Sequence, residues 1–172
     1  MKTLREYIKE AEEKKVAIGH FNISNLEALH GIYNAAKKLG VPVVIGVSEG
    51  EEAFVGLEEV VALVQTIRER DNFPIFLNAD HHNNFESVKA CIDAGFDAVI
   101  LFPQSGPETE RAWIYHAYDQ GLKVIVGGRM THPAYAVSEG GFITDEGALE
   151  MYSIAARAGI NDFVVPGNKP EV

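Results

Sequence analysis

One cysteine, Cys91, stands alone among the 172 residues. A single thiol excludes an internal disulfide framework and favours a reducing, cytoplasmic environment. On its expected helix face, we interpret Cys91 as a small buried residue rather than a reactive thiol. Long apolar runs are also lacking, and no segment approaches the length of a membrane span. The opening residues, 1–15, mix acidic and basic charges in an amphipathic pattern that is not typical of a signal peptide.

Positive charge is scarce as well. Lys and Arg number 15 against 25 Asp and Glu, which gives a formal net charge of −10. Binding to a nucleic-acid backbone needs an excess of Lys and Arg, so we exclude nucleic acid as a partner. The motif G-x-G-x-x-G is absent after every expected strand, and a dinucleotide-binding sheet therefore has no support.

Short apolar runs alternate with amphipathic segments along the whole chain. Runs rich in Val and Ile predict buried strands at 16–21, 41–47, 73–79, 97–102, 122–128 and 162–167. Between them, apolar residues at helical spacing predict crossover helices. This order predicts one α/β domain over residues 1–172, a partial TIM-type (βα) barrel with about six parallel strands and a short N-terminal helix. The repeat length alone also fits a doubly wound sheet.

The segment LNADHHNNF, after the third expected strand, places Asp80, His81 and His82 side by side. Chemistry in a (βα) barrel collects where strands end. A neutral imidazole is a common Zn²⁺ ligand, and a nearby carboxylate can move a proton while a metal polarises a carbonyl. The alternative is a solvated turn in which Asp80 caps the next helix. Spacing alone slightly favours the turn, because one His supplies one ligand and zinc needs at least three.

Polar residues follow the other expected strands too. They are Asn22, Asn25, Ser48, Glu49, Gln104, Ser105, Arg129, Thr131, His132, Asn168 and Lys169. Of the remaining histidines, His132 alone is placed to face the same end of the sheet. We expect His20 and His30 to be structural, His116 to have a surface or packing role, and His82 to be a solvated neighbour.

Two stretches, VAIGHFNISNLEALHGIYNAAKKLGVPVVIGVSEGE and LNADHHNNFESVKACIDAGFDAVI, contain ordered motifs: F-N-x-x-N, S-E-G and a D-H pair. Through them, residues 1–100 resemble class II, zinc-dependent fructose- or tagatose-bisphosphate aldolases. The resemblance implies that Asp80 is the catalytic acid/base, that His81 binds a divalent metal such as Zn²⁺, and that Asn22 and Ser48 line the substrate side. That family's later S-H-G-like and H-G-G-S-G-like metal motifs are not in this chain, which leaves His132 as the local substitute ligand.

Residues 97–172 resemble a second family, the orotidine 5′-monophosphate decarboxylases. The resemblance rests on the M-T-H-P turn at 130–133 and on VVPGNKPE at 164–171. It implies that Thr131, His132 and Pro133 line a base pocket. That family's catalytic Lys–Asp array, D-x-K-x-x-D, has no counterpart in NADHHNN, so the decarboxylase machinery is missing.

Together the two resemblances predict a chimera-like, truncated chain with a junction near 97–102. Both families have eight strands and bind phosphate after the last two, whereas six strands are expected here. Open sheet edges favour a homo-oligomer. Three functions stay open. The first is a class II carbon–carbon lyase acting on a sugar phosphate, with activity reduced or lost through truncation. The second is a decarboxylase-like barrel that binds a nucleotide monophosphate. The third is a non-catalytic scaffold.

Overall fold

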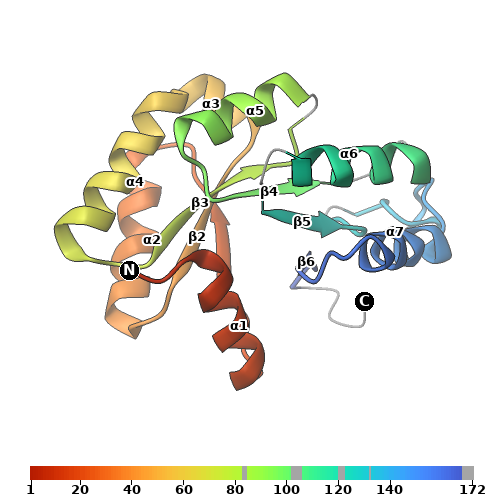
Figure 1. Ribbon diagram of the computed structural model, residues 1–172, viewed down its shortest axis with the longest axis horizontal. Coiled ribbons are helices and arrows are strands. Elements are labelled where there is room, and N and C mark those ends of the chain that lie inside the picture. Colours follow the sequence, from red (N-terminus) through yellow and green to blue (C-terminus); the bar gives the residue numbers. More distant parts are fainter. Residues whose placement is uncertain (83–84, 102–105, 120–122, 132, 168–172) are drawn as a thin grey trace. The chain divides into compact units, whose positions relative to one another are not determined.

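The computed structural model describes residues 1–82, 85–101, 106–119, 123–131 and 133–167. The helices are α1 (Leu4–Lys14), α2 (Leu26–Leu39), α3 (Glu49–Val55), α4 (Leu57–Asp71), α5 (Phe85–Ala94), α6 (Pro107–Asp119) and α7 (Asp145–Arg157), with a 3-10 turn η1 (Val137–Glu139) (Figure 1). The strands are β1 (Gly19–Asn22), β2 (Val43–Val47), β3 (Ile75–Asp80), β4 (Ala98–Leu101), β5 (Val124–Gly127) and β6 (Phe163–Val164). Six parallel strands alternating with helices, after a short N-terminal helix, confirm the predicted α/β partial (βα)-barrel class.

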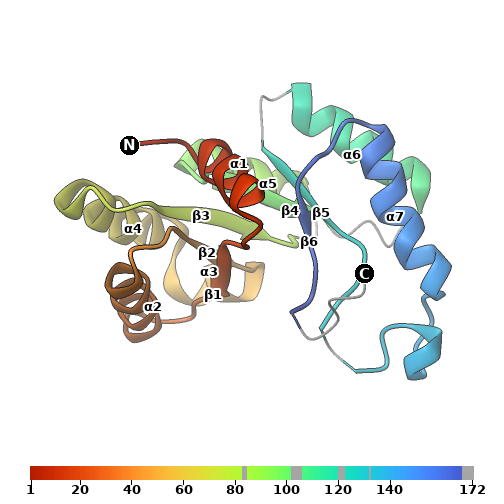
Figure 2. The ribbon, with the colours of Figure 1, turned by 90° about the horizontal axis from the view of Figure 1, so that it is seen from below.

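The chain divides into two compact units, Met1–Ala98 and Val99–Val172. In the first unit β1, β2 and β3 pair in sequence order, and α2 and α4 pack against β2 and β3 (Figure 2). In the second unit β5 pairs with β4 and β6, while α6 and α7 pack on β5 and on each other. The two units are defined by contacts within the structure and do not test the evolutionary origin of either part. The single domain and the junction near 97–102 therefore stay predictions.

Local sequence signals fix the ends of the first helices. Thr3 begins α1 with a capping box, in which Glu6 accepts from the Thr3 backbone and hydroxyl at 2.7 and 2.8 Å. The Asn25 side chain caps α2 by accepting from the Ala28 N–H at 2.8 Å. Gly40 ends α2 in the left-handed conformation, with φ of 67°.

The strands of the first unit hold its core. Every residue of β2 and of β3 is buried, which matches the continuous apolar runs that predicted them. The parallel register aligns Asn22, Gly46 and Asn78 in one row across β1, β2 and β3. A Cβ at Gly46 would lie 2.3 Å from Asn22 Oδ1 and 2.6 Å from the His20 ring. Glycine at this position therefore leaves room for the β1 side chains to reach across β2.

Some predicted boundaries differ from the structure. The first strand begins at Gly19 rather than at residue 16, and Val16 is exposed. The helix α3 was not predicted, because its sequence EGEEAFV has no apolar period and buries no residue. The last strand, β6, has two residues instead of the expected six. Within the described ranges, no helix is both long and apolar enough to span a membrane.

Candidate functional site

Asp80 ends β3 with a carboxylate that is almost fully buried, at 8% exposure. The Asn22 side-chain amide donates to Asp80 Oδ2 at 2.8 Å. Residues 78 and 80 lie two apart on β3 and therefore share a face, the one that Asn22 reaches over Gly46. Burial and this hydrogen bond exclude a solvated turn for Asp80, and they hold one carboxylate at the carboxyl end of the strand.

A second carboxylate, Glu51, is linked to the first through the same amide. Asn22 also donates to Glu51 Oε2, at 2.9 Å, and the Ser48 backbone N–H and hydroxyl both donate to that oxygen at 2.8 Å. The predicted residues Asn22, Ser48 and Asp80 thus join one hydrogen-bonded chain. Glu51 was missed at the level of sequence, although the spacing S-x-x-E of a capping box at Ser48 could have indicated it.

His81 follows with its backbone in the left-handed region, at φ of 42°. Non-glycine residues rarely adopt this conformation, and such strain clusters at functional sites. The His81 side chain is 42% exposed, and its Nε2 lies 3.4 Å from Asp80 Oδ2. The turn at His81 therefore presents an accessible imidazole beside the carboxylate of Asp80.

Below these groups, His20 and Asn78 form a polar pair inside the unit. Asn78 Nδ2 lies 3.1 Å from His20 Nε2, which suits an amide donating to a neutral imidazole. Burial lowers the pKa of His20, and the negative charges of Asp80 and Glu51 raise it only in part. His20 is therefore neutral at physiological pH and supports the site without carrying charge.

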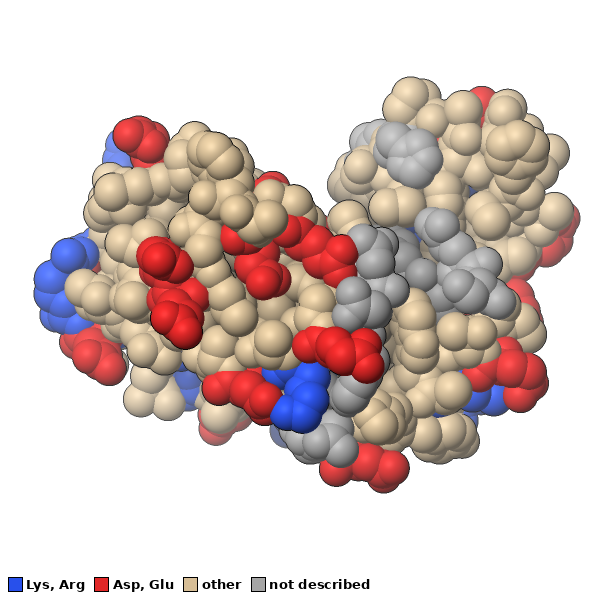
Figure 3. Space-filling model, turned by 90° about the horizontal axis from the view of Figure 1, so that it is seen from above, with Lys and Arg blue, Asp and Glu red and all other residues tan. Residues whose placement is uncertain are grey.

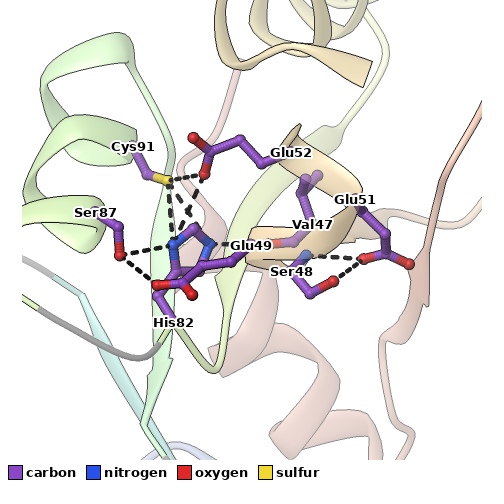
Figure 4. A network of polar contacts seen from close by, with 8 residues as sticks. All are labelled: Val47, Ser48, Glu49, Glu51, Glu52, His82, Ser87 and Cys91. Atoms are coloured by element: carbon purple, nitrogen blue, oxygen red, sulfur yellow. Dashed lines mark hydrogen bonds and ion pairs between the residues drawn. The ribbon is translucent and has the colours of Figure 1, made fainter. Parts of the chain in front are cut away.

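His82 corrects one expectation from the sequence, because it is not a solvated neighbour. Its side chain is fully buried. One ring nitrogen, Nε2, lies 3.2 Å from the Val47 carbonyl oxygen, and the other, Nδ1, lies 3.2 Å from Ser87 Oγ (Figure 4). The left-handed turn at His81 sends the next side chain inward, a backbone effect that neighbouring residue types do not reveal.

Two further potential ligands surround the His82 ring. Glu52 Oε2 lies 3.8 Å from Nδ1, and Cys91 Sγ lies 3.8 and 4.0 Å from the two ring nitrogens (Figure 4). The Cys91 thiol lies 3.4 Å from Glu52 Oε2. Burial raises the pKa of Cys91 strongly, and the Glu52 charge adds to this, so the metal-free protein holds a thiol there. Cys91 is buried, as expected from the sequence.

The predicted metal site at His81 is only partly represented in the described residues. His132 lies outside them. Among the residues that the structure does describe, Glu52, His82 and Cys91 form the one group of three potential ligands whose donor atoms lie within 4.8 Å of one another. A zinc site needs at least three protein ligands. The metal-ligand role of His81 stays a prediction, and the described residues do not complete a set of three around it.

Thr131 and Pro133 lie in the second unit, after β5, and both are exposed. Near them Arg129 is anchored by Asp145 Oδ1 at 2.8 Å, and the Tyr152 hydroxyl accepts from the Arg129 N–H at 3.2 Å. These contacts order the start of the loop that carries Thr131. The substrate-binding role of Thr131 and Pro133 stays a prediction.

Known proteins match this chain over the stretch that carries Asn22, Ser48 and Asp80. The family model for class II fructose-bisphosphate aldolase matches residues 2–105. The chain belongs to this family. Fructose-bisphosphate aldolase from Geobacillus stearothermophilus is 34% identical across 92% of this chain and 58% of its own length. The Staphylococcus epidermidis enzyme of the same name is 32% identical across 71% of this chain and 46% of its own length.

The fold of this aldolase-family chain is shared with solved structures. The YdjI aldolase from Escherichia coli K12 superposes with a TM-score of 0.73 at 18% identity, covering 96% of this chain and 60% of YdjI. The chain thus spans about half to three fifths of the length of these proteins. Because the Geobacillus aldolase aligns over most of both units, the resemblance of residues 97–172 to decarboxylases and the chimeric origin gain no support.

Proposed function

We propose that this chain performs metal-assisted, reversible aldol cleavage of a ketose bisphosphate, with Asp80 as the proton-transfer group. One observation carries the proposal: the Asp80 carboxylate lies at the carboxyl end of β3, nearly buried and fixed by the Asn22 amide at 2.8 Å. A general base needs this combination of fixed geometry and restricted solvent. Membership of the aldolase family supports the reaction class.

The class II reaction uses a divalent metal, proposed to be Zn²⁺, which polarises the substrate carbonyl when bound. His81 would be one ligand. The Asp80 carboxylate accepts the proton of the substrate hydroxyl while the adjacent carbon–carbon bond breaks. The electron pair of that bond moves toward the carbonyl group of the ketone half, which is left as an enediolate, and the aldehyde half departs. The enediolate carbon then takes up a proton from solvent, which gives the ketone product. In the reverse direction Asp80 returns the proton.

Asn22 and Ser48 position this base in the proposal. Asn22 donates to both carboxylates, Asp80 and Glu51, and therefore sets the distance between them. Ser48 fixes Glu51 from the other side. A sugar-phosphate substrate and a cytoplasmic location belong to the same proposal. Oligomer formation through sheet edges stays a prediction.

The test replaces Asp80 by Asn, which keeps the side-chain shape and removes the proton acceptor. We expect the zinc-supplemented chain to cleave fructose or tagatose bisphosphate. We also expect kcat of Asp80→Asn to fall by about 10²–10⁴-fold with little change in KM. Asp93→Asn, on the exposed surface of α5, is the matched control and should keep full activity. Equal kcat in the Asp80 and Asp93 variants, or no bisphosphate cleavage by the parent chain, contradicts the proposal.

A further inference from the structure

We propose that Glu52, His82 and Cys91 bind a second divalent metal ion of the zinc type, separate from the metal expected at His81. The site lies where the start of α3, the segment after β3 and the middle of α5 meet (Figure 4). It is built from residues of the first unit alone. None of the three takes part in the hydrogen-bonded chain of Asp80, Asn22 and Glu51.

The distances between donor atoms suit a tetrahedral ion. Zinc–sulfur bonds of about 2.3 Å and zinc–nitrogen or zinc–oxygen bonds of about 2.0–2.1 Å place neighbouring donors about 3.3–3.6 Å apart. Cys91 Sγ and Glu52 Oε2 are 3.4 Å apart, Glu52 Oε2 and His82 Nδ1 are 3.8 Å apart, and Cys91 Sγ and His82 Nδ1 are 4.0 Å apart. One coordination sphere would require the two distances to Nδ1 to shorten by about half an ångström. It would also require Cys91 Sγ, which lies 3.8 Å from Nε2, to move toward the Nδ1 side of the ring.

The orientation of the His82 ring is a second, independent indication. Nε2 lies 3.2 Å from the Val47 carbonyl, which can only accept, so Nε2 carries the proton. In the neutral ring the lone pair is then on Nδ1, the nitrogen that faces Ser87 Oγ and Glu52. Histidines that bind metals commonly donate their other N–H to a backbone carbonyl in this way, which fixes the tautomer and ring orientation.

A fourth oxygen donor is close at hand. Glu49 Oε1 accepts from the Ser87 hydroxyl at 2.8 Å, and the same hydroxyl lies 3.2 Å from His82 Nδ1. Glu49 lies outside the three residues whose donor atoms are within 4.8 Å of one another, so its side chain would have to move to give a set of Cys, His and two Glu ligands. Four protein ligands are typical of a structural zinc site with no open position. The ion would tie α3 and α5 to the end of β3.

Charge favours a cation here. Glu49, Glu51 and Glu52 all lie in the first turn of α3, which has no basic residue in its last turn. Acidic side chains also predominate over basic ones on the face seen in Figure 3, in keeping with the net charge of −10. The alternative is a metal-free hydrogen-bond network with the same contacts, and the experiment separates the two.

Cobalt spectroscopy reports this site specifically, because Cys91 is the chain's one cysteine. We expect metal-free protein titrated with Co²⁺ to develop a sulfur-to-cobalt charge-transfer band, which Zn²⁺ then displaces. The conservative variant Glu52→Gln and the variant His82→Ala should weaken Co²⁺ and Zn²⁺ binding at this site by at least about tenfold to a hundredfold. His81→Ala should keep the band, since it removes only the other proposed metal ligand.

Glu58→Gln, on the exposed side of α4, is the matched control and should leave the band unchanged. Circular dichroism of each metal-free variant checks that the variant folds. If His82→Ala does not fold, Glu52→Gln alone tests the proposed metal site. No charge-transfer band in the folded parent chain overturns the proposal. Equal affinity in the parent and Glu52→Gln proteins overturns it too. Loss of aldol cleavage with the band retained would refute only the proposed function.

Discussion

At the scale of single residues, three neighbours on the chain reach three different environments. Asp80 ends β3 and is buried against Asn22, His81 turns through a left-handed conformation into solvent, and His82 returns to the interior. Regular strand geometry would alternate these side chains between two faces. Alternation alone would put Asp80 and His82 on one face, but after the positive φ at His81 they contact different residues: Asp80 contacts Asn22, and His82 contacts Val47 and Ser87. The turn separates a carboxylate–imidazole pair from a buried imidazole only one residue away.

His81→Gly should stabilise the fold while it abolishes activity. Glycine adopts a φ of 42° without the Cβ clash that other residues suffer, so we expect the free energy of unfolding to rise by about 0.5–1 kcal/mol. Loss of the imidazole should reduce metal-dependent cleavage to background. Chemical denaturation and the cleavage assay, run on the same preparation, measure the two effects.

Lys15→Gly is the matched control for that prediction. Lys15 ends α1 with φ of 55°, so a glycine there should relieve the same kind of backbone strain. Lys15 has no role in the proposed reaction. It should stabilise the chain by a similar amount and leave cleavage unchanged. If His81→Gly destabilises the fold while Lys15→Gly stabilises it, contacts of the imidazole outweigh the backbone strain, and the strain argument is wrong.

At the scale of elements, the polar row across β1, β2 and β3 depends on the missing side chain at Gly46. A methyl group there would meet Asn22 Oδ1 at 2.3 Å and the His20 ring at 2.6 Å. Gly46→Ala should therefore push Asn22 away from Asp80 and destabilise the fold by about 1–3 kcal/mol. Denaturation midpoints and kcat measure both consequences, and kcat should fall because the base loses its fixed partner.

Gly31→Ala gives the opposite expectation from the same substitution. Gly31 lies inside α2, and a Cβ there would meet no atom within 4 Å. Alanine should stabilise this helix by about 0.5–1 kcal/mol through its higher helix propensity, with no change in kcat. Opposite effects of Gly46→Ala and Gly31→Ala on the free energy of unfolding would separate steric crowding from helix propensity. A stabilising Gly46→Ala would show that the β1 side chains can move aside.

The sequence predicted elements better than it predicted side-chain partners. The apolar run 73–79 predicted β3, and apolar residues at helical spacing between the strands predicted crossover helices such as α2, because periodicity is a local signal. The Glu-rich α3 lacks both an apolar period and a buried face, and it was missed. The contacts of its carboxylates were therefore not predicted. Glu52 contacts Cys91 although the two residues are 39 positions apart in the sequence, because the pairing of β2 with β3 brings α3 and α5 together.

At the scale of the whole molecule, the proposed chemistry and the two candidate metal positions all draw on the first unit. Residues 2–105, which match the aldolase family model, cover that unit and end just beyond it. The second unit affects stability through a buried carboxyl group. Its α6 buries Glu110, whose side chain faces charged residues of α6 and α7. Stability of the molecule should therefore depend on pH through a group that takes no part in the proposed reaction.

Burial raises the pKa of Glu110 from 4.5 to about 7, and its Oε1 has no hydrogen-bond partner among the described residues. Arg111 and Arg157 oppose this shift and Glu150 adds to it. The folded state thus binds this proton more tightly than the unfolded state. Unfolding releases the proton between these two pKa values, so stability should fall as pH rises through that window.

Glu110→Gln mimics the protonated group and should remove that loss. We expect the variant to exceed the parent by about 1–3 kcal/mol near pH 8, and to differ little near pH 4, in denaturant unfolding at both pH values. Glu108→Gln on the same helix is the control, because its side chain is 89% exposed and its ion pair with Arg111 contributes little at either pH. A Glu110→Gln difference that is the same at both pH values would mean that Glu110 titrates in the fold as it does in water. The unpartnered Oε1 would then have to be reached by solvent.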